Sequence, residues 1–203
     1  MRVSRLTPHP GSARLASAIQ QYRSGIAVAE NVFRFTDMTY ANLKDLITGE
    51  GSRKAGGRWN PKGSFPTLYF SLDPETALAE ALAQHRSQNM PDIEATPLVL
   101  TGCRVDVQSI LDLTNPGIRR LLSVTMRQLC QPWRPLQHAG QEALTQAIGR
   151  LARAHGFQGL LAPSAAHVVG RNLVLFRDKV SDNELTIVKP REFPQFRRRF
   201  RRK

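Results

Sequence analysis

Hydrophobic and polar residues along the chain follow two spacings, one typical of strands and one typical of helices. Residues 31–35 and 67–71 alternate with the two-residue period of a strand, so neighbouring side chains point to opposite faces. The first run carries Arg34, a conspicuous residue in a strand. In the second run, Tyr69 and Ser71 share the more polar face. The second run therefore predicts a strand with one buried face.

Helical spacing and strand composition recur through the rest of the chain. The pattern predicts helices over residues 12–24, 74–86, 116–129 and 141–155. It predicts further strands over residues 97–105, 158–162, 172–176 and 185–188. Helices and strands are thus mixed along the chain, and its length of 203 residues suits one domain.

The predicted helix 74–86 carries a carboxylate away from its apolar side. Asp73 is a suitable N-cap, and Pro74 suits the first helical turn. Helical spacing predicts a core-facing stripe made of Leu78, Ala81, Leu82 and His85. Glu80 lies off this stripe, on a neighbouring surface lined by alanines. The helix therefore presents Glu80 outside the core.

Two segments have the composition of loops. Residues 48–63 hold five glycines and a proline, a density of chain-breaking residues that predicts a loop whose backbone approaches a ligand closely. Residues 163–167, which include Ser164, lie between two predicted strands. Both loops are candidate parts of a site.

Composition places the chain among globular proteins. Apolar residues make up 41% and charged residues 22%, ordinary values for a folded domain. The two cysteines form no paired motif, so neither a disulfide framework nor a zinc site is indicated. The sequence contains no apolar run of the ~20 residues that a membrane-spanning helix needs and no secretion signal. We expect a cytoplasmic protein without membrane contact.

Basic residues exceed acidic ones, giving a formal net charge of +13. Part of this excess lies in an arginine-rich end that we expect to be a solvated tail over residues 190–203. A strongly basic chain favours polyanionic partners, and nucleic acid or an acidic protein both fit. A basic nucleic-acid-binding protein is therefore one hypothesis, although no known reading module is recognisable.

Several common catalytic motifs are absent from the sequence. Neither glycine-rich nucleotide motif is present, and no signature of a metal hydrolase or of a nucleophilic serine hydrolase occurs. We therefore expect a site without a metal ion.

The remaining motifs resemble the RES domain, a family named for an arginine, a glutamate and a serine. The run Gly-Gly-Arg-Trp-Asn at residues 56–60 precedes the tyrosine-bearing strand, and Ala-Leu-Ala-Glu follows at residues 77–80. A serine loop then precedes Asn-Leu-Val-Leu-Phe at residues 172–176. The resemblance implies an α+β fold with an ADP-ribosyltransferase-like split β-sheet core and flanking helices. It places the catalytic domain at residues 31–189, after a helical extension at residues 1–30.

The resemblance also implies a reaction, cleavage of NAD⁺ to nicotinamide and ADP-ribose or its phosphorylated form. The family's members are toxins whose usual partner is an antitoxin with an Xre-like helix-turn-helix. DNA contact is then expected only through that complex or the basic tail. NAD⁺ is the substrate, and no cofactor is expected.

The matched residues suit this chemistry. Breaking the bond to nicotinamide builds positive charge on the ribose, which a fixed carboxylate such as Glu80 stabilises. The departing nicotinamide is neutral and needs little protonation. The expected catalytic set is therefore Arg58, Glu80 and Ser164.

A second set of residues is expected to bind the substrate. The planar guanidinium groups of Arg34 and Arg58 suit the diphosphate of NAD⁺. Tyr69 suits stacking on the nicotinamide end, and Asn172 suits contacts to ribose or phosphate. Each has a structural alternative, such as a half-buried core ring for Tyr69. The acceptor of the ADP-ribose stays open among phosphate, water and a macromolecule, the last of which would make the protein an ADP-ribosyltransferase.

Overall fold

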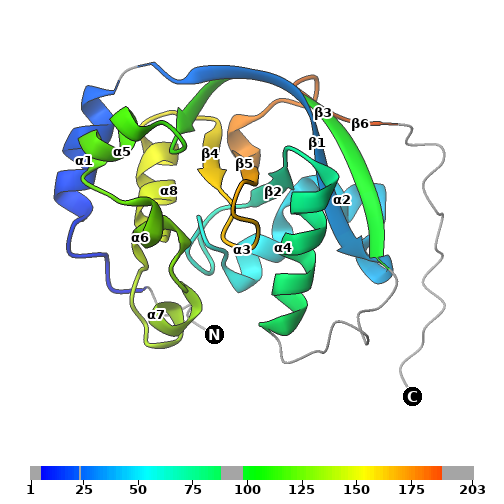
Figure 1. Cartoon of the computed structure of the whole chain (residues 1–203), viewed down its shortest axis with the longest axis horizontal. Coiled ribbons are helices and arrows are strands. Elements are labelled where there is room, and N and C mark those ends of the chain that lie inside the picture. The colour runs from blue at the N-terminus through cyan, green and yellow to red at the C-terminus, as the bar shows by residue number, and fades with distance from the viewer. Residues whose placement is uncertain (1–5, 23, 88–97, 189–203) are drawn as a thin grey trace.

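A computed structural model describes residues 6–22, 24–87 and 98–188, and its strands form one curved sheet with helices around it (Figure 1). The strands are β1 (Ile26–Asp37), β2 (Thr67–Ser71), β3 (Leu98–Asp112), β4 (Gly159–Pro163), β5 (Arg171–Phe176) and β6 (Leu185–Ile187). The helices are α1 (Ser12–Gln21), α2 (Leu43–Thr48), α3 (Glu50–Ala55), α4 (Pro74–Arg86), α5 (Pro116–Leu122), α6 (Met126–Cys130), α7 (Arg134–His138) and α8 (Leu144–Ala154). The fold is therefore α+β, as the sequence predicts.

The sheet has the strand order β1-β2-β5-β4-β3-β6, and β1 also pairs with β3. The pairing of β3 with β4 is parallel, and the other pairings are antiparallel. Strand β1 meets β2 at one pair, Phe33 with Ser71, but follows β3 from Ile26 to Asp37. Because β1 pairs with both β2 and β3, the sheet curls on itself and brings β1, at one edge, against β3, near the other edge.

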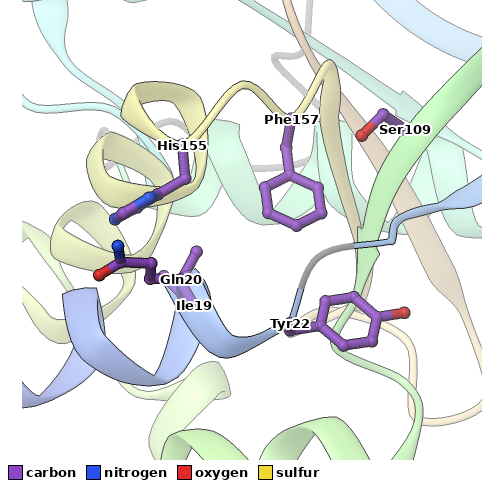
Figure 2. A pocket seen from close by; sticks show the side chains of 6 residues that line it. All are labelled: Ile19, Gln20, Tyr22, Ser109, His155 and Phe157. Carbon is purple, nitrogen blue, oxygen red and sulfur yellow. The ribbon is translucent and has the colours of Figure 1, made fainter.

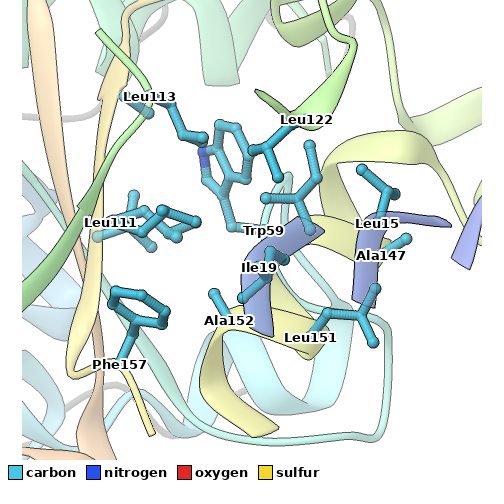
Figure 3. Packing of buried hydrophobic residues seen from close by; sticks show 14 of the residues in the cluster. Leu15, Ile19, Trp59, Leu111, Leu113, Leu122, Ala147, Leu151, Ala152 and Phe157 are labelled. Carbon is cyan, nitrogen blue, oxygen red and sulfur yellow. The ribbon is translucent and has the colours of Figure 1, made fainter. Parts of the chain in front are cut away.

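Two apolar cores lie on the two faces of this curled sheet. One lies within the curl and contains Val32, Leu68, Phe70, Cys103 and Leu173. The other lies between the sheet and helices α1, α5 and α8, and Trp59 is one of its largest fully buried side chains (Figure 3). Trp59 is thus the packing anchor of the Gly-Gly-Arg-Trp-Asn loop.

The outline predicted from the sequence is confirmed for most elements, with corrections at the irregular ones. The segment 48–63 is not loop throughout, because α3 occupies part of it. The predicted helix 116–129 divides into α5 and α6 at Ser123, whose φ of 51° interrupts the helix. The strand that begins at Leu98 continues to Asp112, beyond the predicted end.

The apolar stripe predicted for α4 is wrong at Leu78, which is 39% exposed. The buried residues of the helix are instead Thr76, Ala77 and His85. The helix packs against β1 and β2, and Leu78 is on its exposed side, whereas Ala81 and Leu82 of the predicted stripe are partly buried.

The N-terminal helix α1 packs on α8, and Leu15 and Ile19 lie fully buried in the core around Trp59. The expected basic tail, residues 190–203, lies outside the described residues. Among the residues that are described, no helix combines the length and the hydropathy needed to cross a membrane.

Candidate active site

Glu80 belongs to helix α4, which lies in front of the sheet in the view of Figure 1. The helix begins where its sequence predicts, because the side chain of Asp73 accepts a hydrogen bond from the backbone N–H of Thr76 at 2.7 Å. The hydroxyl of Thr76 donates to the other oxygen of Asp73 at 2.8 Å. This double contact fixes the first turn, and Glu80 follows on the next turn of the same helix.

The carboxylate of Glu80 is held by two hydrogen bonds from distant parts of the chain. The hydroxyl of Ser164 donates to Oε1 at 2.6 Å, and the amide Nδ2 of Asn172 donates to the same oxygen at 2.7 Å. No donor from the described residues contacts Oε2. One oxygen of the carboxylate is therefore anchored by two donors.

Ser164 lies in a tight loop between β4 and β5. Its hydroxyl accepts hydrogen bonds from the backbone N–H groups of Ala166 and His167, at 3.1 and 3.0 Å. With these two donors in place, the hydroxyl proton points to Glu80. The loop is also joined to α4, since Nδ1 of His167 lies 2.9 Å from the hydroxyl of Thr76. The serine is thus a fixed donor, and His167 has a structural contact.

Asn172 is the second residue of β5 and is oriented by a residue that sequence reasoning missed. The hydroxyl of Ser71, on β2, donates to Oδ1 of Asn172 at 2.8 Å. This bond makes Oδ1 the acceptor and turns Nδ2 toward Glu80. The two strands pair with Ser71 opposite Asn172. The only sequence signal was the polar face of β2, which does not reveal the register.

Arg58 reaches across from the glycine-rich loop to the end of α6. Its Nη1 donates to the carbonyl oxygens of Leu129 and Gln131, at 3.0 and 2.7 Å. Burial lowers the pKa of Arg58, and the charge of Glu80 partly opposes this. Within the described part of the chain, Arg58 forms no ion pair with Glu80. The guanidinium therefore lies near the carboxylate without neutralising it.

Tyr69 holds the loop that carries Arg58. Its hydroxyl accepts a hydrogen bond from the backbone N–H of Trp59 at 3.0 Å and donates to Oδ1 of Asn60 at 2.7 Å. A Cβ added at Gly57 would overlap this hydroxyl, so the loop needs glycine there. Burial raises the pKa of Tyr69 above its usual range. The hydroxyl is engaged within the protein, and contact of the ring with nicotinamide stays a prediction.

Among the described residues, no hydrogen bond or ion pair joins Arg34 to Glu80, Ser164 or Asn172. It shares its face of β1 with Val32 in the inner core, whereas the neighbouring Phe33 is opposite Ser71. Burial lowers the pKa of Arg34, and Cys103 is the neighbour that opposes this. Its contact with the diphosphate stays a prediction.

Within the described residues, neither a metal-binding group nor the pocket includes Glu80, Ser164, Asn172 or Arg58. No group of three or more histidine, cysteine, aspartate or glutamate side chains there has the arrangement to hold a metal ion. A pocket of 320 Å³ lies between α1, the end of α8 and β3 (Figure 2), and none of its lining residues belongs to the Glu80 cluster. The candidate site is therefore the cluster of Glu80, Ser164, Asn172 and Arg58.

Comparisons with known proteins identify a family and two kinds of relative. A family model of the RES domain matches residues 31–195. The NAD(+) phosphorylase MbcT of Mycobacterium bovis is 28% identical over 148 residues, which are 72% of this chain and 73% of that protein. The protein of the same name from Mycobacterium tuberculosis has the same identity and coverage. A crystal structure of the M. tuberculosis MbcT–MbcA toxin–antitoxin complex matches with a TM-score of 0.68 and 25% identity, covering 87% of this chain and 90% of that chain.

Proposed function

The chain belongs to the RES domain family, and from that premise we propose that it is a toxin that cleaves the nicotinamide–ribose bond of NAD⁺. The similarity to NAD(+) phosphorylase MbcT supports this activity and favours inorganic phosphate as the acceptor. Depletion of cellular NAD⁺ is then the toxic effect. Water as the acceptor, which would make the protein a glycohydrolase, is the second possibility within the same chemistry.

The observation that carries the proposal is the fixed carboxylate of Glu80. When the C–N bond breaks, its electron pair leaves with nicotinamide, which becomes neutral, and positive charge develops on the ribose. Oε2 of Glu80, to which no described residue donates, stabilises that charge, while Ser164 and Asn172 hold Oε1 in place. A phosphate oxygen then donates an electron pair to the ribose carbon, giving phosphorylated ADP-ribose.

The remaining residues of the proposed site bind and position NAD⁺. Arg58 offers a guanidinium to a phosphate group, because its two bonds to carbonyl oxygens use a single nitrogen, Nη1. Arg34 is the second candidate for the diphosphate, and the ring of Tyr69 is the candidate for the nicotinamide. NAD⁺ serves here as substrate, and the reaction as written uses no further cofactor. The proposal includes an ADP-ribosyltransferase-like fold for this chain. The curled sheet of mixed parallel and antiparallel strands supports it.

The natural inhibitor of such a toxin is proposed to be an antitoxin. The matching crystal structure is that of a toxin–antitoxin complex, and this supports a protein partner for the present chain. An Xre-like helix-turn-helix in that partner, and DNA contact through the complex, follow from the family resemblance. The cytoplasm, where the NAD⁺ pool lies, is the proposed location.

The decisive experiment incubates the purified protein with NAD⁺, with and without phosphate, and follows the products by NMR. The wild type is expected to release nicotinamide, and phosphate dependence separates phosphorolysis from hydrolysis. Glu80→Gln is expected to lower the rate by about 100-fold or more, the usual effect of removing one electrostatic stabiliser. Glu30→Gln is the matched control, because Glu30 is exposed on β1 and outside the site.

Intact NAD⁺ in every condition would overturn the proposal. In that case, the remaining enzymatic alternative is transfer of ADP-ribose to a macromolecule. Labelled NAD⁺ and cell extract test it. Nucleic-acid binding, which the net charge of +13 favours, is the alternative outside enzymes. That alternative predicts that Glu80→Gln leaves the biological effect unchanged.

A further inference from the structure

Arg134, a residue outside the sets named so far, lies beside the helix that carries Glu80. Its guanidinium carbon is 4.7 Å from the centroid of the Trp133 ring, which supports it from one side. Its Nη2 donates to Oε1 of Gln84 at 2.6 Å. Gln84 is four residues, or about one helical turn, beyond Glu80 on α4. Arg134 is therefore held in place on the same side of α4 as Glu80.

Arg58 approaches the same place from the glycine-rich loop. Its Nη1 binds the carbonyl oxygen of Gln131, three residues before Arg134. Burial lowers the pKa of Arg134, and the positive charge of Arg58 lowers it further. Arg58 from the glycine-rich loop and Arg134 from the start of α7 thus lie close enough for their charges to interact, and the charge of Glu80 acts on Arg58.

Neither guanidinium has an acidic partner among the residues that the structure describes. Arg150 pairs with Glu142 and Arg153 with Asp178, but no ion pair includes Arg58 or Arg134. Their hydrogen bonds go to carbonyl oxygens and to a neutral amide. Adjacent like charges that the fold leaves uncompensated are suited to a dianionic ligand, and the planar guanidinium matches a phosphate group.

We propose that Arg134 and Arg58 form a phosphate-binding subsite beside Glu80. This rests on the proposed function, which supplies two sources of the ligand: the inorganic phosphate acceptor and the diphosphate of NAD⁺. Arg134 brings a charge that Trp133 and Gln84 hold in position before the ligand arrives. The site then has one carboxylate for the ribose cation and two guanidiniums for the phosphate.

Steady-state kinetics in which NAD⁺ and phosphate are varied separately test the subsite and identify its ligand. Arg134→Gln is expected to raise one KM by about 10- to 100-fold, the effect of losing a charge-assisted hydrogen bond. A higher KM for phosphate alone assigns the acceptor, and a higher KM for NAD⁺ alone assigns the diphosphate. Arg134→Lys, which keeps the charge, is expected to have a KM between that of the wild type and that of Arg134→Gln. Arg120→Gln on the exposed side of α5 removes the same charge elsewhere and is expected to change neither KM.

A binding measurement separates failure of the subsite from failure of the proposed function. Titration of the wild type with phosphate and pyrophosphate alone, by calorimetry, is expected to give binding that Arg134→Gln weakens and Arg120→Gln does not. If the wild type leaves NAD⁺ intact but this binding depends on Arg134, the function fails and the subsite stands. Unchanged KM values together with unchanged anion binding in a folded Arg134→Gln protein would overturn the subsite.

Discussion

At the scale of single residues, the orientation of one amide decides how Glu80 is held. An asparagine side chain offers an oxygen on one side and an NH₂ group on the other, and only the NH₂ group can donate to a carboxylate. Ser71 settles the choice, because its hydroxyl donates to Oδ1 of Asn172. Ser71 is itself almost fully buried, so water does not replace this bond.

Ser71→Ala is expected to lower kcat about fivefold to tenfold, because one neutral hydrogen bond contributes about 1 kcal/mol. Without the hydroxyl, Oδ1 of Asn172 loses its partner and the amide no longer has a single preferred orientation. Rates at saturating NAD⁺ check this, and Ser71→Thr, which keeps a hydroxyl, is expected to restore most of the rate. An unchanged kcat in Ser71→Ala would show that Ser164 alone suffices to position Glu80.

Tyr69 gives the folded protein a pH dependence in the alkaline range. Because burial raises its pKa, the folded state keeps the phenol proton at a pH where the unfolded chain, near pKa ~10, has lost it. The contribution of this proton to stability is complete below about pH 10 and is lost as the pH rises further, by up to about 1.4 kcal/mol per pH unit. Urea unfolding between pH 8 and pH 11 would measure this slope.

The variant Tyr69→Phe is expected to lack that slope. At pH 8 it should also be less stable by about 1–3 kcal/mol, since the backbone N–H of Trp59 and Oδ1 of Asn60 lose their partner. Tyr40→Phe is the control, because Tyr40 is 58% exposed. Equal alkaline slopes in the two variants would contradict this role of Tyr69.

The sequence identifies the members of the cluster better than their arrangement. The family motifs predict Glu80, Ser164 and Asn172 as site residues, and the fold brings these three side chains together. The role of Ser71 depends on the register between β2 and β5, which alternation within one strand does not contain. The same limit applies to Arg34, whose direction depends on how β1 curls with the sheet.

At the scale of elements, the glycine-rich loop is positioned by its contact with α8. A Cβ on Gly149 would overlap the carbonyl oxygen of Trp59, so the helix and the loop backbone touch directly. Gln146, one turn earlier on α8, donates to the carbonyl oxygen of Gly57 at 3.0 Å. Helix α8 thus fixes the loop that carries Arg58.

Gly149→Ala is expected to destabilise the protein by about 1–3 kcal/mol, the usual cost of forcing an extra group into a packed core. The backbone on both sides has to shift, so the loop and Arg58 move with it and activity falls as well. Thermal unfolding and NAD⁺ cleavage measure the two effects. Gly51→Ala on α3 is the control, because a Cβ at that position meets no atom within 4 Å. Equal stability of the two variants would rule out the tight contact.

Elements with regular patterns were predicted well, and irregular ones were not. Asp73 and Pro74 mark the start of α4 because capping is a local property of the chain. The density of glycines predicted a loop where the structure has α3, a helix of six residues that follows directly after α2. The break at Ser123 contains no proline or glycine, so the local sequence does not predict its left-handed backbone conformation.

At the scale of the whole molecule, the net charge and the proposed catalysis are separable. The net charge of +13 includes the arginine-rich end, which lies outside the described residues, whereas the Glu80 cluster lies on α4, β5 and two loops of the described part of the chain. Removing residues 190–203 is therefore expected to leave the rate of NAD⁺ cleavage unchanged and to weaken binding to DNA or RNA. Cleavage assays and gel shifts on both proteins test this. Loss of cleavage on truncation would instead tie the tail to the active fold.

The Glu80 cluster joins residues that are far apart in the order of synthesis. Ser164 and Asn172 follow Glu80 by 84 and 92 positions, and β5 lies between β2 and β4 in the sheet. A growing chain that has not reached β5 has neither the donors for Glu80 nor the central strand of the sheet. The cell that makes the protein therefore meets the assembled Glu80 cluster only after translation has passed Asn172, and a chain that ends before β5 is expected to carry the glutamate without cleaving NAD⁺.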